Sequence, residues 1–431
     1  MGQHRDILRI ALPAIVTNVT VPLLGLVDTA IAGHLGRAEC IGGIAVGGVM
    51  LGLVYQNFIF LRMGTSGITA QAFGAGRASE AAATLQRSIR LAALIGAALI
   101  ALQFPLQWIA LLAVGPSEEV GALARSYFYI VIWGAPAILV TMAVKGWLLG
   151  MQDSRAPMVL SVSVNLANIA ASLVAVYGLG LGFRGIACGT IVAEYAGLAL
   201  ALWMASRKLA SSGMSGIRGR AGRLAGRAGR FFAVNRDIFL RSVCLMAVTL
   251  TFTALGARCG DLELAANALM IQLFLLVSYF LDGFAFAGEA VVGRLAGAGL
   301  RAETRRCVGR LFQWGAGIMV VFAAVYALFS AEIFGLLTDD AAVVAVAWRY
   351  RWWCALLPVA GMAGFVWDGV FVGMTATRGM LMAVAVAVAV FFVICFLPVG
   401  GMSNHRLWAA FVSYLAMRGA VSTLYYRARL R

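Results

Sequence analysis

Charge is scarce in this sequence. Only 12% of its 431 residues are Asp, Glu, Lys or Arg, whereas about a quarter of a soluble globular domain is charged. The shortage of charge therefore excludes an ordinary soluble protein. The composition equally excludes a disordered chain, which would be rich in polar and charged residues.

The sequence also lacks the patterns of a metal centre or a disulfide framework. Its seven cysteines are scattered with no CxxC pair, and its three histidines lie far apart. Zinc sites need clustered Cys and His residues, and small disulfide-rich domains need regularly spaced cysteines. We therefore predict no metal site and no bound cofactor.

Long hydrophobic runs are abundant instead. Hydrophobic residues make up 62% of the chain, and a helix needs about 20 of them to cross a bilayer. The run after MGQHRDILRI is too long for a signal peptide, so we expect it to be retained as a first helix. The pattern predicts an all-α integral membrane protein with twelve transmembrane helices. Their expected spans are 7–34, 41–70, 86–113, 119–150, 156–179, 184–206, 236–259, 264–294, 307–337, 341–373, 377–400 and 406–428.

The two halves of the sequence repeat. The segment 146–158 reads GWLLGMQDSRAPM, and 369–380 reads GVFVGMTATRGM, with the shared residues 223 positions apart. The same offset relates Gly74-Ala75-Gly76 to Gly297-Ala298-Gly299. One offset at separated landmarks indicates a duplicated six-helix unit. Because six is even, both copies enter the membrane from the same side, and the repeats are parallel.

The repeat divides the chain into two predicted lobes, residues 1–206 and 237–431. Residues 207–236 form a basic cytoplasmic linker between them. Within it, four arginines share one helical face. This leaves two interpretations, a solvated linker or a helix on anionic lipid, and the high glycine content favours the solvated linker. The four are Arg220, Arg223, Arg227 and Arg230.

The positive charge follows the expected loops. If the N-terminus is cytoplasmic, the loops and tails on that side hold 24 of the 34 Lys and Arg residues, against 7 outside and 3 within helices. This asymmetry predicts a multi-pass protein of a bacterial inner (plasma) membrane with both termini in the cytoplasm. The net charge of +16 therefore does not indicate nucleic-acid binding.

Asp28 lies deep in the first predicted helix, where an ionisable residue suggests a function. Gly25 and Ala32 make its helix face small, so we expect it to pack on protein or face a cavity. Loss of hydration there disfavours the charged carboxylate. Pro22, six residues earlier, removes a backbone hydrogen bond and supplies a hinge. The alternative is a structural Asp that caps a neighbouring helix. We favour a proton-carrying role because no basic residue lies within helical reach.

Polar residues form a stripe on the fifth predicted helix. Ser161, Asn165, Asn168 and Ser172 are spaced 4, 3 and 4 residues apart, which places them on one face. Such residues either join helices by hydrogen bonds, each worth about 0.6 kcal/mol, or line a hydrated cavity. Four on one face exceed what helix association needs. We therefore predict a cavity wall, and we count Tyr55 among the cavity residues.

Further charged residues lie within predicted helices. Lys145 and Asp368 occupy equivalent positions of the two repeats, and Asp282 and Glu289 lie on one helix. A salt bridge from Lys145 to Asp282 or Asp368 and a functional role for these charges are both compatible with the pattern. The sequence does not say which residues pair.

Five segments carry a family likeness. They are NVTVPLLGLVDTAIAGHLG, FLRMGTSGITAQAFGAG, KGWLLGMQDSRAP, GTIVAEYAG and YFLDGFAFAGEAVVG. Together they resemble the multidrug and toxic compound extrusion (MATE) family and, within it, the DinF branch. The resemblance extends over nearly the whole chain and implies twelve helices in two lobes. It also implies an antiporter rather than an enzyme, which exports amphipathic, often cationic compounds on a proton or sodium gradient.

The resemblance also suggests site residues. In proton-driven and archaeal members a first-helix Asp is the coupling acid, and Asp28 matches it. An Asn, an Asp and a Thr surround that acid; Asn168 and Thr190 match two of them, whereas Ser172 replaces the Asp. The seventh-helix acid of the NorM branch is missing here, although Asp368 can match its acid in helix 10. Losing a carboxylate weakens a sodium site, so the resemblance favours proton coupling through Asp28.

The resulting hypothesis is a proton-coupled exporter that works by alternating access. Protonation of Asp28 from outside would bend the first helix at Pro22 and release the substrate. A sodium-coupled exporter and a lipid-linked saccharide flippase are the alternatives. Expected partners are small amphipathic or cationic substrates and membrane lipids, with no nucleic acid, and the chain is expected to act as a monomer.

Overall fold

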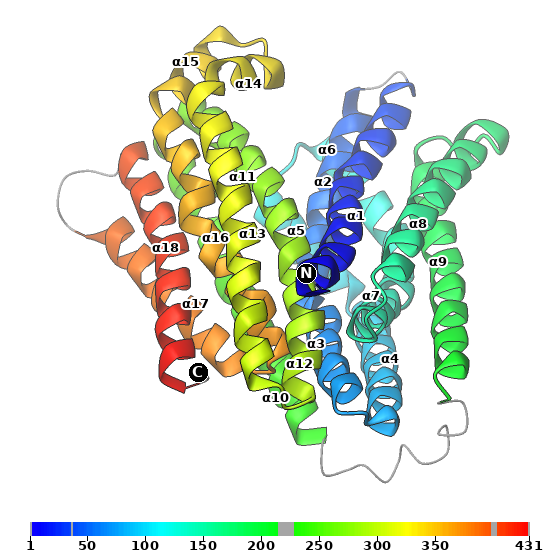
Figure 1. The fold of residues 1–431 in the computed structure, drawn as a ribbon. Coiled ribbons are helices and arrows are strands. Elements are labelled where there is room, and N and C mark those ends of the chain that lie inside the picture. The colour runs from blue at the N-terminus through cyan, green and yellow to red at the C-terminus, as the bar shows by residue number, and fades with distance from the viewer. Residues whose placement is uncertain (1, 36–37, 214–227, 398–402, 430–431) are drawn as a thin grey trace. The chain divides into compact units, whose positions relative to one another are not determined.

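The computed structural model describes residues 2–35, 38–213, 228–397 and 403–429 (Figure 1), and their regular structure is helical throughout. The first half contains α1 (Gly2–Gly33), α2 (Ala38–Tyr55), η1 (Gln56–Phe58), α3 (Phe60–Gly74), α4 (Ala78–Ala101), α5 (Gln103–Val114), α6 (Glu118–Val131), η2 (Ile132–Gly134), α7 (Ala135–Gly150), α8 (Arg155–Leu173), η3 (Val174–Gly178) and α9 (Phe183–Ser211). The second half contains α10 (Ala228–Ala257), α11 (Asp261–Ala287), η7 (Gly288–Val292), α12 (Gly293–Gly297), α13 (Arg301–Leu328), α14 (Ser330–Leu337), α15 (Ala341–Arg349), α16 (Arg351–Gly373), α17 (Thr377–Phe396) and α18 (Asn404–Arg429).

Twelve helical segments in the described ranges are long and apolar enough to cross a membrane, which confirms the predicted number. Three predicted spans, 86–113, 307–337 and 341–373, are too long. The third includes the short helix α15, and its spanning helix α16 begins at Arg351. The spanning helices α4 and α13 end at Ala101 and Leu328, and the short helices α5 and α14 follow them. The prediction is wrong here because the sequence stays apolar through each break. Hydrophobicity alone therefore does not mark where the spanning helix ends.

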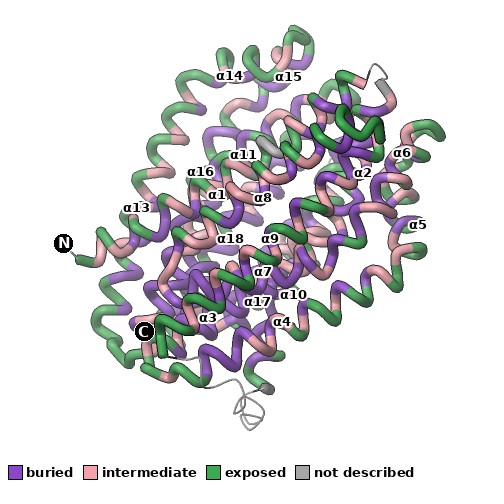
Figure 2. The backbone as a smooth tube through the Cα atoms, turned by 90° about the vertical axis from the view of Figure 1, so that its right-hand side faces the viewer, coloured by how far each residue is buried: buried purple, intermediate pink, exposed green. Residues whose placement is uncertain are grey.

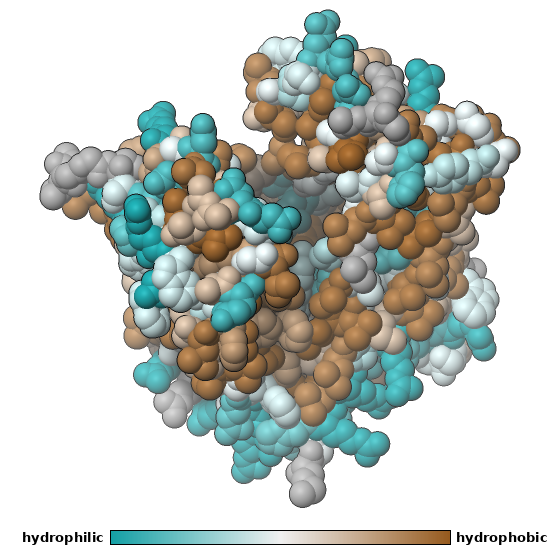
Figure 3. All heavy atoms as spheres, turned by 90° about the horizontal axis from the view of Figure 1, so that it is seen from above, coloured by the Kyte–Doolittle hydropathy of each residue, from teal (hydrophilic) through white to brown (hydrophobic). Residues whose placement is uncertain are grey.

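Large apolar side chains cover the outer surfaces of the helices. Several leucines are between 70% and 86% exposed. Figure 3, which views the molecule from above, shows hydrophobic residues on the surface together with hydrophilic ones. A soluble monomer rarely exposes apolar patches of this extent, so these surfaces face lipid. The chain is therefore a multi-pass membrane protein. The leucines are Leu94, Leu112, Leu328 and Leu336.

The chain divides into two compact units by its internal contacts. The N-unit contains residues 16–235, and the C-unit contains residues 1–15 and 236–431. The predicted lobes, 1–206 and 237–431, were drawn from the repeat and remain a prediction. Of the four linker arginines, Arg220, Arg223 and Arg227 lie outside the described residues. Arg230 lies on α10 and donates a hydrogen bond to Gln71 Oε1 at 2.8 Å.

Backbone geometry carries the same repeat as the sequence. Gln152 and Thr375 are the two non-glycine residues of the described chain with positive φ, at 63° and 51°, and they lie 223 positions apart. Gly76 and Gly299, with φ of 67° and 76°, have the same separation. Left-handed backbone is costly for residues other than glycine. Its recurrence at one offset confirms that the halves are copies of one helical unit.

Two equivalent glycines hold the central helix of each unit against its neighbour. A Cβ added to Gly146 of α7 would lie 2.2 Å from the carbonyl oxygen of Arg62, and one added to Gly369 of α16 would lie 2.1 Å from that of Ala285. Such close approach is possible only because glycine lacks a side chain. The spans containing α7 and α16 are accordingly the most buried, whereas the visible faces of α5 and α13 are mostly not (Figure 2).

Residues typical of N-caps precede two of the helices. Asp340 precedes α15, and its side chain accepts hydrogen bonds from the backbone N–H groups of Ala342 and Val343. Ser117 precedes α6, with two acids in the first turn, but its hydroxyl makes no capping hydrogen bond. At α6 the helix dipole and the two acids therefore supply the favourable interaction without a side-chain cap.

Candidate functional site

Asp28 of α1 is buried in the N-unit and is only 6% exposed. Its Oδ1 has no hydrogen-bond partner, and no Lys or Arg of the described residues pairs with it. The titratable group that senses its charge is Tyr127 of α6. A buried acid without a cation is costly when ionised, because neither water nor an opposite charge stabilises it.

The helix face beside Asp28 is partly open. Ala32 is fully buried, as expected for close packing. Gly25 is different, because a side chain added there would meet no atom within 4 Å. Of the two expected environments, packing on protein or facing a cavity, Ala32 has the first and Gly25 does not. Glycine instead leaves free space one turn from the acid.

Hydrogen bonds join α8 to α9 next to this acid. Asn168 Nδ2 donates to Thr190 Oγ1 at 3.1 Å, and Ser172 Oγ donates to Asn168 Oδ1 at 3.4 Å. Thr190 Oγ1 also donates to the carbonyl oxygen of Ile186, and that oxygen is the alternative acceptor for the single Ser172 hydroxyl proton. Gly189 of α9 permits the approach, since a Cβ there would lie 2.3 Å from Ser172 Oγ. The structure thus brings together the three residues that the family likeness selected.

Two tyrosines connect this network to Asp28 and to a second acid. Tyr127 is buried and lies within hydrogen-bonding reach of Thr190, and it interacts electrostatically with Asp28 and Glu194. Tyr55, at the end of α2, interacts with Tyr127 and Glu194, and its buried hydroxyl has no partner among the described residues. The predicted cavity residue Tyr55 therefore belongs to the same cluster.

The rest of the polar stripe on α8 is divided between two environments. Asn165 Nδ2 donates to the carbonyl oxygen of Thr20 at 3.2 Å, which ties α8 to α1 two residues before Pro22. Ser161 is buried, and its hydroxyl has no partner in the described chain. Pro22 itself is exposed within a continuous helix. The described stripe residues therefore include both helix-joining and unpartnered groups.

Lys145 of α7 and Glu194 of α9 influence each other electrostatically, a relation that the sequence analysis missed. Lys145 also interacts electrostatically with Arg62. Glu194 lies in the middle of the predicted helix 184–206, so its depth was readable from the sequence. Its partner was not, because the pairing depends on which faces of α7 and α9 pack together.

Asp368 of α16 has a different partner from the one predicted. It accepts hydrogen bonds from Arg418 Nη2 of α18 at 2.7 Å and from Arg241 Nη2 of α10. All three side chains are buried. The predicted alternative of a Lys145–Asp368 bridge is therefore wrong. Arg241 was counted with the cytoplasmic charge around the linker, yet it is buried, 13 residues after the start of α10.

The remaining candidates lie on the segment that follows α11. Asp282 is half-buried and interacts electrostatically with Tyr279. Glu289 is fully buried inside η7, a π-helical turn. π-Helical turns often occur at functional sites. Both acids belong to the C-unit.

Twelve spanning helices, an internal duplication and buried charges of both signs together define a multi-pass membrane transporter. The sequence profile of the MatE family matches residues 13–174 and 238–397, one match in each half. The chain belongs to the MatE family. The resemblance recognised in its motifs is thereby confirmed, and because members of the family are transporters, an enzymatic function is not supported.

Individual relatives agree with this assignment. The chain is 39% identical to DNA damage-inducible protein F of Escherichia coli over 95% of its own length and 89% of that protein. It is 25% identical to a probable multidrug resistance protein NorM of Deinococcus radiodurans over 99% and 96% of the two chains.

Solved structures show the same fold. The crystal structure of the Vibrio cholerae MATE transporter VcmN in its bent form has a TM-score of 0.86 at 18% identity, covering 99% of this chain and 97% of that one. A MATE protein in the straight conformation has a TM-score of 0.84 at 19% identity, covering 99% and 96%.

Proposed function

We propose that this chain is a proton-coupled antiporter of a bacterial inner membrane that exports amphipathic, often cationic compounds by alternating access. Relatives named as multidrug resistance proteins support the substrate class. The observation that carries the proposal is the carboxyl group of Asp28, which is buried, unpartnered at Oδ1 and next to open space at Gly25. An acid in this position can exchange a proton without first breaking a salt bridge.

A proton suits this cluster better than a sodium ion does. Hard cations prefer several oxygen ligands, among them carboxylates. Ser172 stands where a second carboxylate would be, and its hydroxyl is engaged with Asn168 or Ile186. The cluster thus lacks a carboxylate on α8 beside Asn168, whereas a proton on Asp28 needs no further ligand.

Protonation can be coupled to a movement of α1. The ionised carboxylate favours a state in which water reaches Asp28, whereas the neutral form tolerates a closed, dry site. Pro22 removes one helical hydrogen bond, so α1 bends most easily in that turn. The bond from Asn165 to Thr20 transmits the bend to α8. Coupling requires only that the two protonation states favour different conformations.

Drug resistance and transport assays with Asp28→Asn test the proposal. Asn resembles the protonated carboxyl in shape but cannot release a proton, so we expect drug export driven by a pH gradient to fall to background. Asp339→Asn is the matched control, because Asp339 is an exposed acid at a helix start, and it should retain export. Full export by Asp28→Asn would exclude the coupling role.

Proteoliposomes separate the two coupling ions. A fluorescent cation should be transported when a proton gradient is imposed and should not respond to a sodium gradient. Sodium-driven transport by the wild type, with no response to pH, would replace the proton in the proposal.

A further inference from the structure

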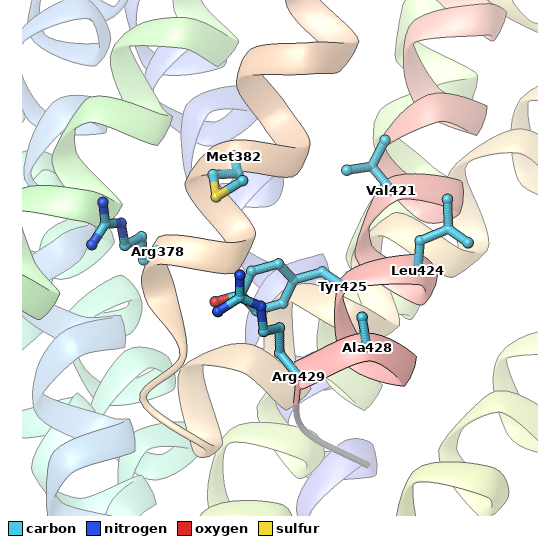
Figure 4. A pocket seen from close by; sticks show the side chains of 7 residues that line it. All are labelled: Arg378, Met382, Val421, Leu424, Tyr425, Ala428 and Arg429. Carbon is cyan, nitrogen blue, oxygen red and sulfur yellow. The ribbon is translucent and has the colours of Figure 1, made fainter.

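A pocket of about 630 Å³ lies between α17 and α18 of the C-unit (Figure 4). Both helices are candidate membrane spans, and the pocket lies where α17 begins and α18 ends. It is therefore at the level of the membrane interface. The residues that shape it are Arg378, Met382, Val421, Leu424, Tyr425 and Arg429.

The pocket combines positive charge with apolar walls. Arg378 and Arg429 are exposed; Arg378 lies on α17 at the edge of the pocket, and the Arg429 and Tyr425 side chains extend from α18 toward α17 (Figure 4). Met382 is 50% exposed and Leu424 is 64% exposed. Neither arginine makes an ion pair within the described chain. The pocket thus offers two free guanidinium groups at one end of a hydrophobic surface.

Gly379 creates the room for the tyrosine. A Cβ at this position would lie 2.4 Å from a ring carbon of Tyr425. The ring also packs edge-to-face on Phe371, with centroids 5.9 Å apart. The absence of a side chain at Gly379 therefore lets the Tyr425 ring pack against the start of α17.

The other repeat shows what is special about this pocket. At the equivalent place in the N-unit, Asp153 accepts an ion pair from Lys208 at 3.1 Å. The residue 223 positions after Asp153 is Ala376, whereas Arg155 is retained as Arg378. The C-unit therefore lacks the acid at this position, while Arg378, the counterpart of Arg155, is present. An anion from outside the chain can supply the missing negative charge.

We propose that this pocket binds one anionic phospholipid. Its phosphate group lies between the guanidinium groups of Arg378 and Arg429, and its acyl chains run along the exposed apolar face of α17. That face continues beyond Met382 with Val386 and Val393, which are 43% and 61% exposed. Basic pockets between membrane helices recognise acidic head groups in this way. The continuous apolar wall favours a lipid over a free phosphate ion.

The proposal does not depend on proton coupling, so its test measures lipid binding instead of transport. The full-length protein in detergent is titrated with phosphatidylglycerol or with phosphatidylcholine of identical acyl chains, and bound lipid is counted by native mass spectrometry. We expect the wild type to bind one phosphatidylglycerol about tenfold more tightly than phosphatidylcholine. The variant Arg378→Gln/Arg429→Gln should lose this preference.

A control variant removes the same charge elsewhere. Arg301→Gln/Arg427→Gln neutralises two exposed arginines that do not line the pocket, and it should keep the tenfold preference. Equal losses in both double variants, or no loss in either, would overturn the site. Displacement of the lipid by equimolar glycerol 3-phosphate would reassign the pocket to a soluble phosphate and also overturn the proposal.

A second variant guards against poor folding of the first. Leu424→Glu places a negative charge on an exposed wall and removes no buried contact. We expect it to reduce phosphatidylglycerol binding by repelling the head group, with an unchanged thermal transition. Wild-type binding of phosphatidylglycerol by this variant would contradict the proposed path of the lipid.

Discussion

Asp368 shows how a single side chain can hold a buried excess of positive charge. It accepts hydrogen bonds from two arginines, so the trio carries a net charge of +1. Arg418 also lies over the rings of Phe365 and Tyr414, each 5.6 Å from the guanidinium carbon. Aromatic faces attract cations, particularly where water is excluded. The carboxylate and the rings together compensate two guanidinium groups.

Because one carboxylate pairs with two arginines, we expect removal of the acid to destabilise the protein more than removal of one arginine. Asp368→Asn leaves two buried cations facing each other, and breaking a buried pair from one side costs about 3–5 kcal/mol. We therefore expect a large fall in the thermal unfolding temperature of the purified protein. Arg418→Met leaves a balanced pair with Arg241 and should lower that temperature less. The reverse order would show that Arg241 does not pair with Asp368.

Ser172 is the residue at which coupling-ion preference can be altered. Ser172→Asp adds a carboxylate within the network of Asn168 and Thr190, close to Asp28. We expect the variant to gain sodium-stimulated transport in proteoliposomes, because two carboxylates and two neutral oxygens suit a hard cation. Ser172→Asn is the matched variant, since it adds similar bulk without charge and should gain no sodium response. Sodium stimulation of both variants would attribute the effect to side-chain volume instead.

Individual site residues were predictable from the sequence to different extents. Asp28 was identified because an acid within a long apolar run is rarely explained by a structural role alone. Glu194 had the same signature and could have been found by it. Arg241 could not, since a basic residue near the predicted start of a helix reads equally well as interfacial. Which charges pair depends on helix rotation, and a 3.6-residue pattern in a nearly all-apolar helix does not define that rotation.

Helices α7 and α16 are each positioned by one glycine, Gly146 or Gly369. We expect Gly146→Ala and Gly369→Ala to destabilise the protein by a comparable amount, about 1–3 kcal/mol each, because an added methyl group must displace a helix backbone. Thermal unfolding in detergent measures the effect. Gly309→Ala in α13 is the control, as its Cβ would meet no atom within 4 Å. Unequal losses at the two glycines would mean that the equivalent interfaces differ in rigidity.

Helix α1 is the element that the proposed mechanism requires to bend. Pro22→Ala restores a donor N–H for the carbonyl group of Asn18 and should stiffen the helix. We expect lower drug efflux at an unchanged expression level. Pro105→Ala, near the start of α5, removes a proline from a position that helices tolerate and should leave efflux unchanged. Wild-type efflux by the Pro22→Ala transporter would locate the flexible point elsewhere.

At the level of helices, the sequence predicted the spans well and their ends less well. Twelve apolar runs became twelve candidate spans because a lipid-exposed helix must be apolar over a fixed length. The ends of α4 and α13 were misplaced because α5 and α14, which follow them, are apolar as well. Length and hydropathy cannot distinguish a helix that continues from one that breaks and turns.

The duplication places charge on the same two helices of each unit, with the signs exchanged. In the N-unit, the cation Lys145 is on α7 and the anion Glu194 is on α9. In the C-unit, the anion Asp368 is on α16 and the cation Arg418 is on α18, and Lys145 and Asp368 are 223 positions apart. Both units therefore have opposite charges on this pair of helices, but the helix that carries the cation differs between them. An attraction between two helices depends only on the product of the charges, so evolution could exchange the signs without losing the contact.

The whole-molecule prediction is that both ends of the chain lie in the cytoplasm. An even number of spans places the ends on one side, and the excess of Lys and Arg in alternate loops identifies that side. A fluorescent protein fused after Arg429 should therefore fluoresce. Alkaline phosphatase, which needs an oxidising compartment for its disulfides, should be active when fused at Asp339 and inactive when fused at Ala298. Active phosphatase at Ala298 with an inactive fusion at Asp339 would invert the orientation. Protons that drive export would then have to reach Asp28 from the opposite face of the membrane.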